Sequence, residues 1–127
     1  MPRTLAGKLA AAFGNVDAMT ALYAADVVWS LPTSTGLPTP YKGRDTVVAF
    51  NREVWGKYYR ADCTIDLLDE TGDGDVSAAR FIYKAFSLIA NKHYENEYTL
   101  FVRSKDGRIT EVFEAFDTAL SFRLYEP

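Results

Sequence analysis

The dipeptide Asp106-Gly107 restricts the fold of this chain more than any other feature. It stands within a stretch from Tyr94 to Thr118 in which polar and apolar residues tend to alternate. Asp-Gly favours a two-residue turn between antiparallel strands, so this stretch is predicted to form a β-hairpin. In that hairpin Lys105 faces Arg108, and every other cross-strand pair follows from this one.

The predicted register places three polar side chains on one face of the hairpin, among apolar neighbours. Asn96 faces Asp117, and Tyr98 lies on the same side because side chains alternate along a strand. A few polar groups among apolar walls are typical of a small-molecule pocket. A three-residue turn would shift the register by one residue, and Glu114 would then take the place of Asp117 on this face.

The rest of the chain shows helical spacing first and strand spacing later. A loop with three prolines, from Leu31 to Tyr41, separates the first strand from the third helix. The predicted order is helix, helix, strand, helix and four strands, at residues 5–16, 18–24, 27–29, 44–58, 63–70, 76–89, 93–103 and 108–118. This order predicts an α+β fold in which early helices cover one face of a curved antiparallel sheet.

Composition limits the classes of function. The 127 residues are expected to form one domain, residues 1–127. A net charge of -3 without a basic cluster argues against binding to nucleic acid or to an anionic membrane. The single cysteine, Cys63, excludes an internal disulfide and fits a cytoplasmic protein. No apolar run approaches the roughly 20 residues that a membrane span needs.

The sequence gives no signature of a cofactor or a metal. The only histidine, His93, stands beside a turn, where we expect it to be exposed. No matching set of ligands accompanies it, so a catalytic metal is not expected, although carboxylates alone can hold a hard cation. No Ser-His-Asp order and no phosphate-binding glycine loop is present.

Several segments resemble one known family. They are residues 17–29, 41–45, 94–98 and 106–109 with 114–118. In these segments the chain resembles the nuclear transport factor 2-like (NTF2-like) superfamily and, within it, the SnoaL-like, ketosteroid-isomerase-related proteins. The resemblance covers nearly the whole chain. It implies a cone-shaped, cystatin-like α+β fold, with helices packed on a strongly curved antiparallel sheet around a pocket, and a homodimer formed through the outer sheet face.

The resemblance also bears on the reaction. Ketosteroid isomerases use a tyrosine and two aspartates, and the corresponding positions here are Gly7, Leu31 and Tyr98 or Thr99. Their machinery is therefore not expected. SnoaL-type polyketide cyclases use an aspartate on the last strand, and Asp117 matches that position.

The resemblance thus implies a SnoaL-like enzyme of the isomerase, cyclase or lyase type. It would use cofactor-free acid/base catalysis on a small hydrophobic carbonyl or polyketide-like compound. The alternative is a non-catalytic module for hydrophobic ligands or for dimerisation, since this fold hosts both enzymes and binding proteins.

Four residues are candidates for catalysis. In an apolar cavity the pKa of Asp117 would rise and suit an acid or base, whereas at a strand end the same side chain would hold the backbone. Tyr98 and Asn96 could donate hydrogen bonds to a substrate oxygen or simply form a satisfied network. Glu114 corresponds to an acid/base glutamate of some relatives.

Aromatic side chains are predicted to form the pocket walls. The six candidates for substrate binding are Tyr23, Trp29, Phe50, Trp55, Phe86 and Phe113. The same spacings also suit core packing, in which case side chains would fill the cone.

Overall fold

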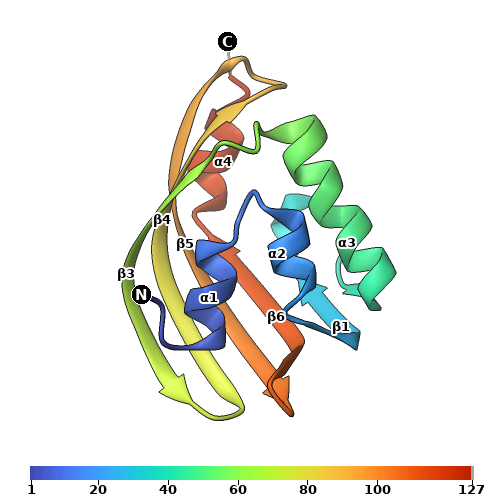
Figure 1. Ribbon diagram of the computed structural model, residues 1–127. Helices are drawn as coiled ribbons and strands as arrows, with labels where there is room; N and C mark the ends of the chain where they lie inside the picture. Colours follow the sequence, from blue (N-terminus) through green and yellow to red (C-terminus); the bar gives the residue numbers. More distant parts are fainter. Residues whose placement is uncertain (127) are drawn as a thin grey trace.

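The computed structural model describes residues 1–126, except for the side chain of Asp73. A strongly bent six-stranded sheet carries the helices on its concave side (Figure 1). The helical elements are α1 Leu5–Ala11, α2 Val16–Thr20, a 3-10 turn Thr33–Thr35, α3 Arg44–Glu53, a π-helical turn Val54–Tyr58 and α4 Thr118–Arg123. The strands are β1 Tyr23–Ser30, β2 Tyr41–Lys42, β3 Thr64–Asp73, β4 Val76–Ser87, β5 Lys92–Lys105 and β6 Arg108–Phe116.

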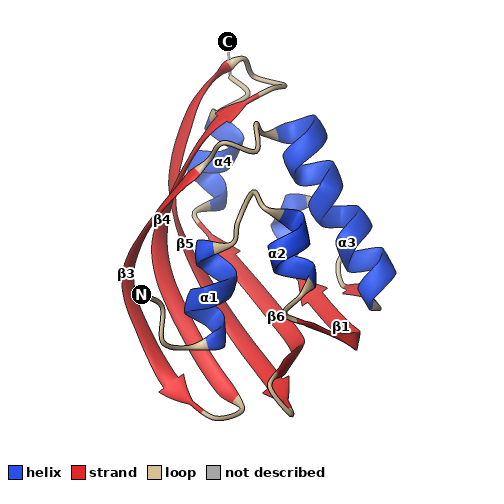
Figure 2. Cartoon of the chain, in the orientation of Figure 1, coloured by secondary structure: helices blue, strands red, loops and turns tan. Residues whose placement is uncertain are grey.

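The strands lie in the order β2-β1-β6-β5-β4-β3 (Figure 2). All neighbouring pairs are antiparallel except β1 and β6, which run parallel. The predicted α+β class, with helices packed on a strongly curved sheet, is confirmed, but the sheet is mixed rather than wholly antiparallel. The prediction followed the order of strands along the chain, whereas β1 pairs with a strand that comes more than eighty residues later.

The first helix is anchored to the sheet through Glu70. The Glu70 carboxylate accepts hydrogen bonds from the backbone N–H groups of Arg3 and Thr4 and from the Thr4 hydroxyl. These bonds lower the Glu70 pKa to about 2. A Cβ at Gly7 would lie 2.5 Å from Glu70 Oε1, so the position at which ketosteroid isomerases carry a tyrosine has no room for a side chain in this arrangement.

The hairpin between β5 and β6 has the predicted turn but a different register. Lys105 faces Arg108, and Asp106 and Gly107 both have positive φ, as a two-residue turn of this type requires. Thr110 is then an extra residue, because Ser104 pairs with Ile109 and Arg103 with Glu111. This β-bulge shifts every later pair by one residue.

The predicted pairing of the pocket residues is therefore wrong. Tyr98 faces Phe116 rather than Ala115, and Leu100 faces Glu114. The bulge turns Glu114 to the inner face, where it is buried. The shift that we expected from a three-residue turn thus occurs with a two-residue turn.

The boundaries of several elements also differ from the prediction. The first helix ends at Ala11, and the first strand begins at Tyr23. The second helix ends at Thr20, because Tyr23 already pairs with Ile109 in the sheet. The last strand ends at Phe116, and the residues after it form α4, a helix that we did not predict.

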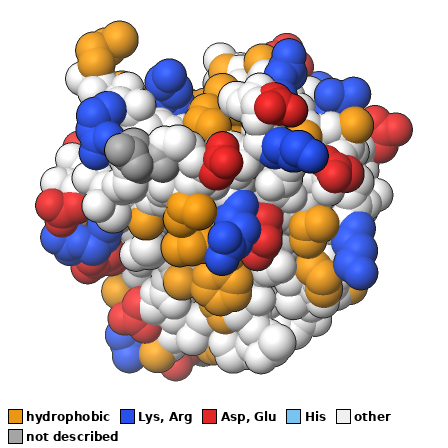
Figure 3. All heavy atoms as spheres, turned by 90° about the horizontal axis from the view of Figure 1, so that it is seen from below, with side chains coloured by type: hydrophobic (Ala, Val, Ile, Leu, Met, Phe, Trp, Pro, Cys, Tyr) orange, Lys and Arg blue, Asp and Glu red, His pale blue; other side chains and the backbone are white. Residues whose placement is uncertain are grey.

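The outer face of the sheet exposes some hydrophobic side chains. Phe101 and Phe113 are neighbours across β5 and β6, and 38% and 43% of their surfaces are exposed. The lower end of the molecule, as it is oriented in Figure 1, also shows hydrophobic patches between intermixed positive and negative side chains (Figure 3). Dimerisation through the outer sheet face stays a prediction.

In the described part of the chain, every helix is too short or too polar to cross a bilayer.

Candidate functional site

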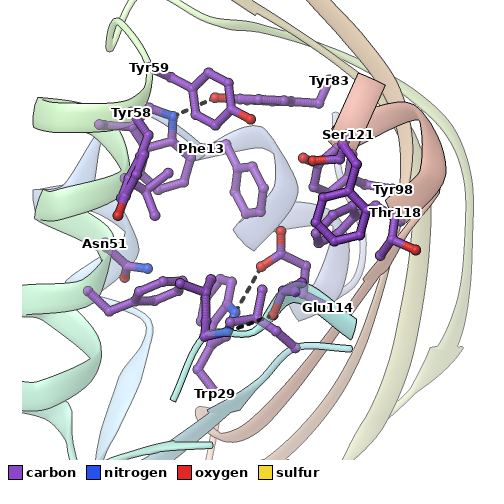
Figure 4. A pocket seen from close by; sticks show the side chains of 18 of the residues that line it. Phe13, Trp29, Asn51, Tyr58, Tyr59, Tyr83, Tyr98, Glu114, Thr118 and Ser121 are labelled. Atoms are coloured by element: carbon purple, nitrogen blue, oxygen red, sulfur yellow. Dashed lines mark hydrogen bonds between the residues drawn. The ribbon is translucent and has the colours of Figure 1, made fainter. Parts of the chain in front are cut away.

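A cavity of about 200 Å³ lies between α3, α4 and the concave face of the sheet (Figure 4). Side chains of the loop after β1 and of α4 contribute to its rim, where Leu37, Phe122 and Tyr125 are exposed. The lining is mostly aromatic and consists of Phe13, Trp29, Leu31, Thr35, Leu37, Phe50, Asn51, Val54, Trp55, Tyr58, Tyr59, Tyr83, Tyr98, Glu114, Phe116, Thr118, Ser121, Phe122 and Tyr125.

Glu114 is the only carboxylate among these lining residues. Only 8% of its surface is exposed, and the indole Nε1–H of Trp29 donates a hydrogen bond to Glu114 Oε1 over 2.9 Å. Burial raises the Glu114 pKa to about 7, while the bond from Trp29 opposes this rise. The side chain can therefore both accept and release a proton near neutral pH.

The tyrosine hydroxyls of the cavity remain protonated under the same conditions. Burial raises the pKa values of Tyr59, Tyr83 and Tyr98 above that of an ordinary phenol. Trp55 Nε1–H donates to the Tyr83 hydroxyl over 2.8 Å. These groups can donate hydrogen bonds to a ligand, but they do not supply a base.

A hydrogen-bond network around Asn96 supports the hydroxyl of Tyr98. The Asn96 Oδ1 atom accepts from the backbone N–H of Glu97, so Nδ2 is directed to the Tyr94 hydroxyl, 2.7 Å away, and to the carbonyl of Asp117, 3.0 Å away. The Tyr94 and Tyr98 hydroxyls lie 2.9 Å apart. Asn96 thus orders Tyr98 and ties the start of α4 to β5.

Asn51 of α3 contributes an amide to the cavity wall. The Tyr23 hydroxyl donates to Asn51 Oδ1 over 2.6 Å, and both side chains are buried. In Figure 4 the Asn51 amide and the Glu114 carboxylate approach the cavity from opposite sides.

The candidate Asp117 lies outside the lining of the cavity. Its side chain is exposed and accepts a hydrogen bond from the backbone N–H of Leu120, as the N-cap of α4. The prediction that Asp117 shares a face with Tyr98 is wrong, because the bulge at Thr110 shifts the register. The alternative prediction, in which Asp117 holds the backbone at the strand end, is confirmed.

Three of the six predicted wall residues line the cavity: Trp29, Phe50 and Trp55. Tyr23 is buried behind the wall, where it contacts Asn51. Phe86 and Phe113 were wrongly predicted as walls, because they alternate with the inward-facing residues of β4 and β6. The Arg60 guanidinium lies over the Phe86 ring, 5.1 Å from its centre.

Sequence reasoning missed Asn51 and the residues of α4. Asn51 follows Val47 by four residues and precedes Val54 by three, so helical spacing alone places it on the buried face. A polar residue on a buried helix face is a signal of function or of a specific hydrogen bond.

His93 is exposed, as expected. Among the side chains that the structure describes, no group of three or more His, Cys, Asp or Glu is placed to hold a metal ion.

Solved structures of similar proteins show the same fold. An NTF2-like protein of unknown function from Burkholderia pseudomallei K96243 is 22% identical, with 97% of this chain and 95% of that chain covered and a TM-score of 0.80. A candidate polyketide cyclase from Xanthomonas campestris pv. campestris is 21% identical, with 96% and 94% covered and a TM-score of 0.81.

A third structure, from Catenulispora acidiphila DSM 44928, has a ketosteroid isomerase-like fold and was solved in complex with trimethylamine. It is 16% identical, with 90% of this chain and 85% of that chain covered and a TM-score of 0.73. At these identities the likeness shows the fold alone.

The family model of the SnoaL-like domain matches residues 9–112, which is most of the chain. None of the curated proteins matches this sequence. The matched segment includes α2, α3 and most of the sheet that surrounds the cavity. The chain therefore belongs to the SnoaL-like family, and its fold is NTF2-like.

Proposed function

We propose that the protein is a cofactor-free acid/base enzyme that moves a proton on a small hydrophobic carbonyl compound, with Glu114 as the base. The observation that carries this proposal is the placement of Glu114. It is a buried carboxylate in an aromatic cavity, and its pKa is raised to about 7. A general base works best when its pKa lies near the operating pH.

In the proposed step the Glu114 carboxylate removes a proton from the carbon next to the carbonyl group. The electron pair of that C–H bond forms a C=C bond, and the carbonyl electrons move onto oxygen to give an enolate. Glu114 then returns the proton to the same carbon or to another carbon of the conjugated system. The Trp29 indole holds the carboxylate in place during both transfers.

The hydroxyl of Tyr98 would assist by donating a hydrogen bond to a substrate oxygen. Asn96 donates to the Tyr94 hydroxyl, which shares a hydrogen bond with the Tyr98 hydroxyl; when Tyr94 is the donor of that bond, the Tyr98 proton is available to the cavity. With this order of donors, Asn96 acts as a positioning residue. Asp117 is not part of the proposed site, since its side chain caps α4.

Deuterium exchange tests the proposal. Acetophenone in deuterium oxide should gain deuterium at its methyl group faster with the wild-type protein than in buffer alone. Glu114→Gln keeps an oxygen that accepts the Trp29 bond, yet it should lower the protein-dependent rate by a factor of about 100 or more, the usual contribution of a general base. Asp117→Asn is the matched control and should keep the rate. A folded Glu114→Gln protein with full exchange activity would refute the assignment.

A second candidate function is non-catalytic binding of a hydrophobic ligand. The aromatic walls and the single carboxylate favour an organic cation, which binds well over aromatic faces. The neighbour from Catenulispora acidiphila was solved with trimethylamine, which fits this candidate. Binding of trimethylammonium that is lost in Glu114→Gln, without any protein-dependent proton exchange, would favour binding over catalysis.

A further inference from the structure

The side-chain amide nitrogen of Asn51 has no hydrogen-bond partner among the residues that the structure describes. Asn51 is 1% exposed, so water at the protein surface does not satisfy this group. Unpaired buried donors are rare in native proteins, and each one calls for a specific explanation. Here the nitrogen belongs to a residue that lines the cavity, which points to a ligand as its partner.

The orientation of the amide is fixed from behind. The hydroxyl of Tyr23, which is fully buried, donates to Asn51 Oδ1 over 2.6 Å. This arrangement satisfies both the tyrosine proton and the amide oxygen, so Nδ2 is the atom left facing the cavity. Figure 4 shows it directed toward the side from which Glu114 enters.

The charge of the lining restricts the ligand. None of the residues that line the cavity is Lys, Arg or His, and Glu114 is their single carboxylate. An anionic ligand would place a second negative charge in this apolar space without a counterion, at a high cost in desolvation. The lining therefore selects against carboxylates and phosphates.

The volume restricts the ligand further. An engineered apolar cavity of about 150 Å³ is large enough to bind benzene. The cavity of about 200 Å³ thus accommodates one ring with a small substituent.

We infer that Asn51 Nδ2 anchors the carbonyl oxygen of an uncharged compound of about one ring, with the acidic C–H group held toward Glu114. The inference rests on the proposed function and adds the substrate class and the oxygen anchor. As Glu114 takes the proton, negative charge develops on the carbonyl oxygen, and the bond from Asn51 becomes stronger. Tyr23 is a positioning residue, because it acts through Asn51.

The test compares the binding of two compounds of similar shape, acetophenone and isopropylbenzene, of which only the first has a carbonyl oxygen. Dissociation constants are measured by ligand-observed NMR titration for the wild-type protein and for Asn51→Leu. Because the two compounds partition differently from water, the ratio of their dissociation constants is compared between proteins. One lost hydrogen bond should shift this ratio by about tenfold against acetophenone.

Two further variants separate binding from folding. Tyr23→Phe combined with Asn51→Leu removes both hydrogen-bond partners and leaves no buried polar group unpaired, so this double variant is expected to fold. It should show the same shift in the ratio as Asn51→Leu. Thr46→Leu, at an exposed position of the same helix, is the control and should leave the ratio unchanged.

The inference is overturned if the double variant has the same ratio as the wild-type protein, or if the wild-type protein binds benzoate more tightly than acetophenone. Its failure can be told from failure of the proposed function. An unchanged ratio of dissociation constants in the Asn51 variants would refute the role of Asn51 and leave the role of Glu114 untouched. Deuterium exchange that survives Glu114→Gln would refute the role of Glu114 and leave the role of Asn51 untouched.

Discussion

Replacing Glu114 by glutamine is expected to stabilise the protein at alkaline pH and to change its stability little in acid. The folded protein holds the Glu114 pKa at about 7, against 4.5 for an ordinary glutamate. Between these pH values the folded state binds a proton that the unfolded state has released. The free energy of unfolding therefore falls as the pH rises, by up to about 1.4 kcal/mol per pH unit.

The magnitude follows from the two pKa values. Above about pH 7 the ionised carboxylate costs the folded state about 3 kcal/mol, since the pKa values differ by about 2.5 and each pH unit corresponds to about 1.4 kcal/mol. Glutamine carries no charge at any pH and keeps an acceptor for Trp29. The variant should thus be more stable by about 3 kcal/mol near pH 8 and nearly equal near pH 4.5.

Urea denaturation followed by tryptophan fluorescence, at a series of pH values from about 5 to about 8, measures this difference. Glu95→Gln removes a carboxylate from an exposed position and should change the free energy by no more than about 0.5 kcal/mol throughout. A difference between wild-type and Glu114→Gln proteins that does not vary with pH would refute the reasoning, because it would mean that burial does not raise this pKa.

Three other changes test neighbouring contacts. Trp29→Phe removes the hydrogen bond that lowers the Glu114 pKa, so the pH at which exchange activity rises should move upward. A pH–rate profile measures this midpoint, and an unchanged midpoint would contradict the prediction. Asn96→Ala leaves the Tyr94 hydroxyl and the Asp117 carbonyl without their donor. Urea denaturation should show a loss of about 1–3 kcal/mol in the free energy of unfolding, and a smaller loss would show that these bonds contribute little to stability. Asp117→Ala removes a helix cap at a cost of about 1 kcal/mol, measured by thermal unfolding, and should leave exchange activity unchanged; loss of activity would place this residue in the site after all.

The fold could be predicted because its signals are local. Alternation along β4 and β5, helical spacing before them and the Asp106-Gly107 turn each depend on a few adjacent residues. The pairing of β1 with β6 could not be predicted in this way, since it joins segments that are distant in the sequence.

The site was harder to predict because one bulge decides which side chains face inward. Ile109 and Val112 are both apolar and both buried, yet they are three residues apart, which strict alternation does not allow on one face. That spacing was an available signal of the bulge. Asp117 was predicted as a pocket residue because it directly follows a strand. The helix that it caps has only six residues, so its start was hard to recognise in the sequence.

The bulge at Thr110 also has a consequence for how proteins of this shape diversify. If Thr110 joined the ladder opposite Arg103, every later residue of β6 would turn over, and Phe113 and Ala115 would replace Glu114 in the cavity wall without any substitution among them. Deleting Thr110 would instead keep Glu114 opposite Leu100, because the residues on either side of the bulge already have these partners. The acid/base group of such a protein thus depends on which residue is left out of the ladder, as well as on which residues the strand contains.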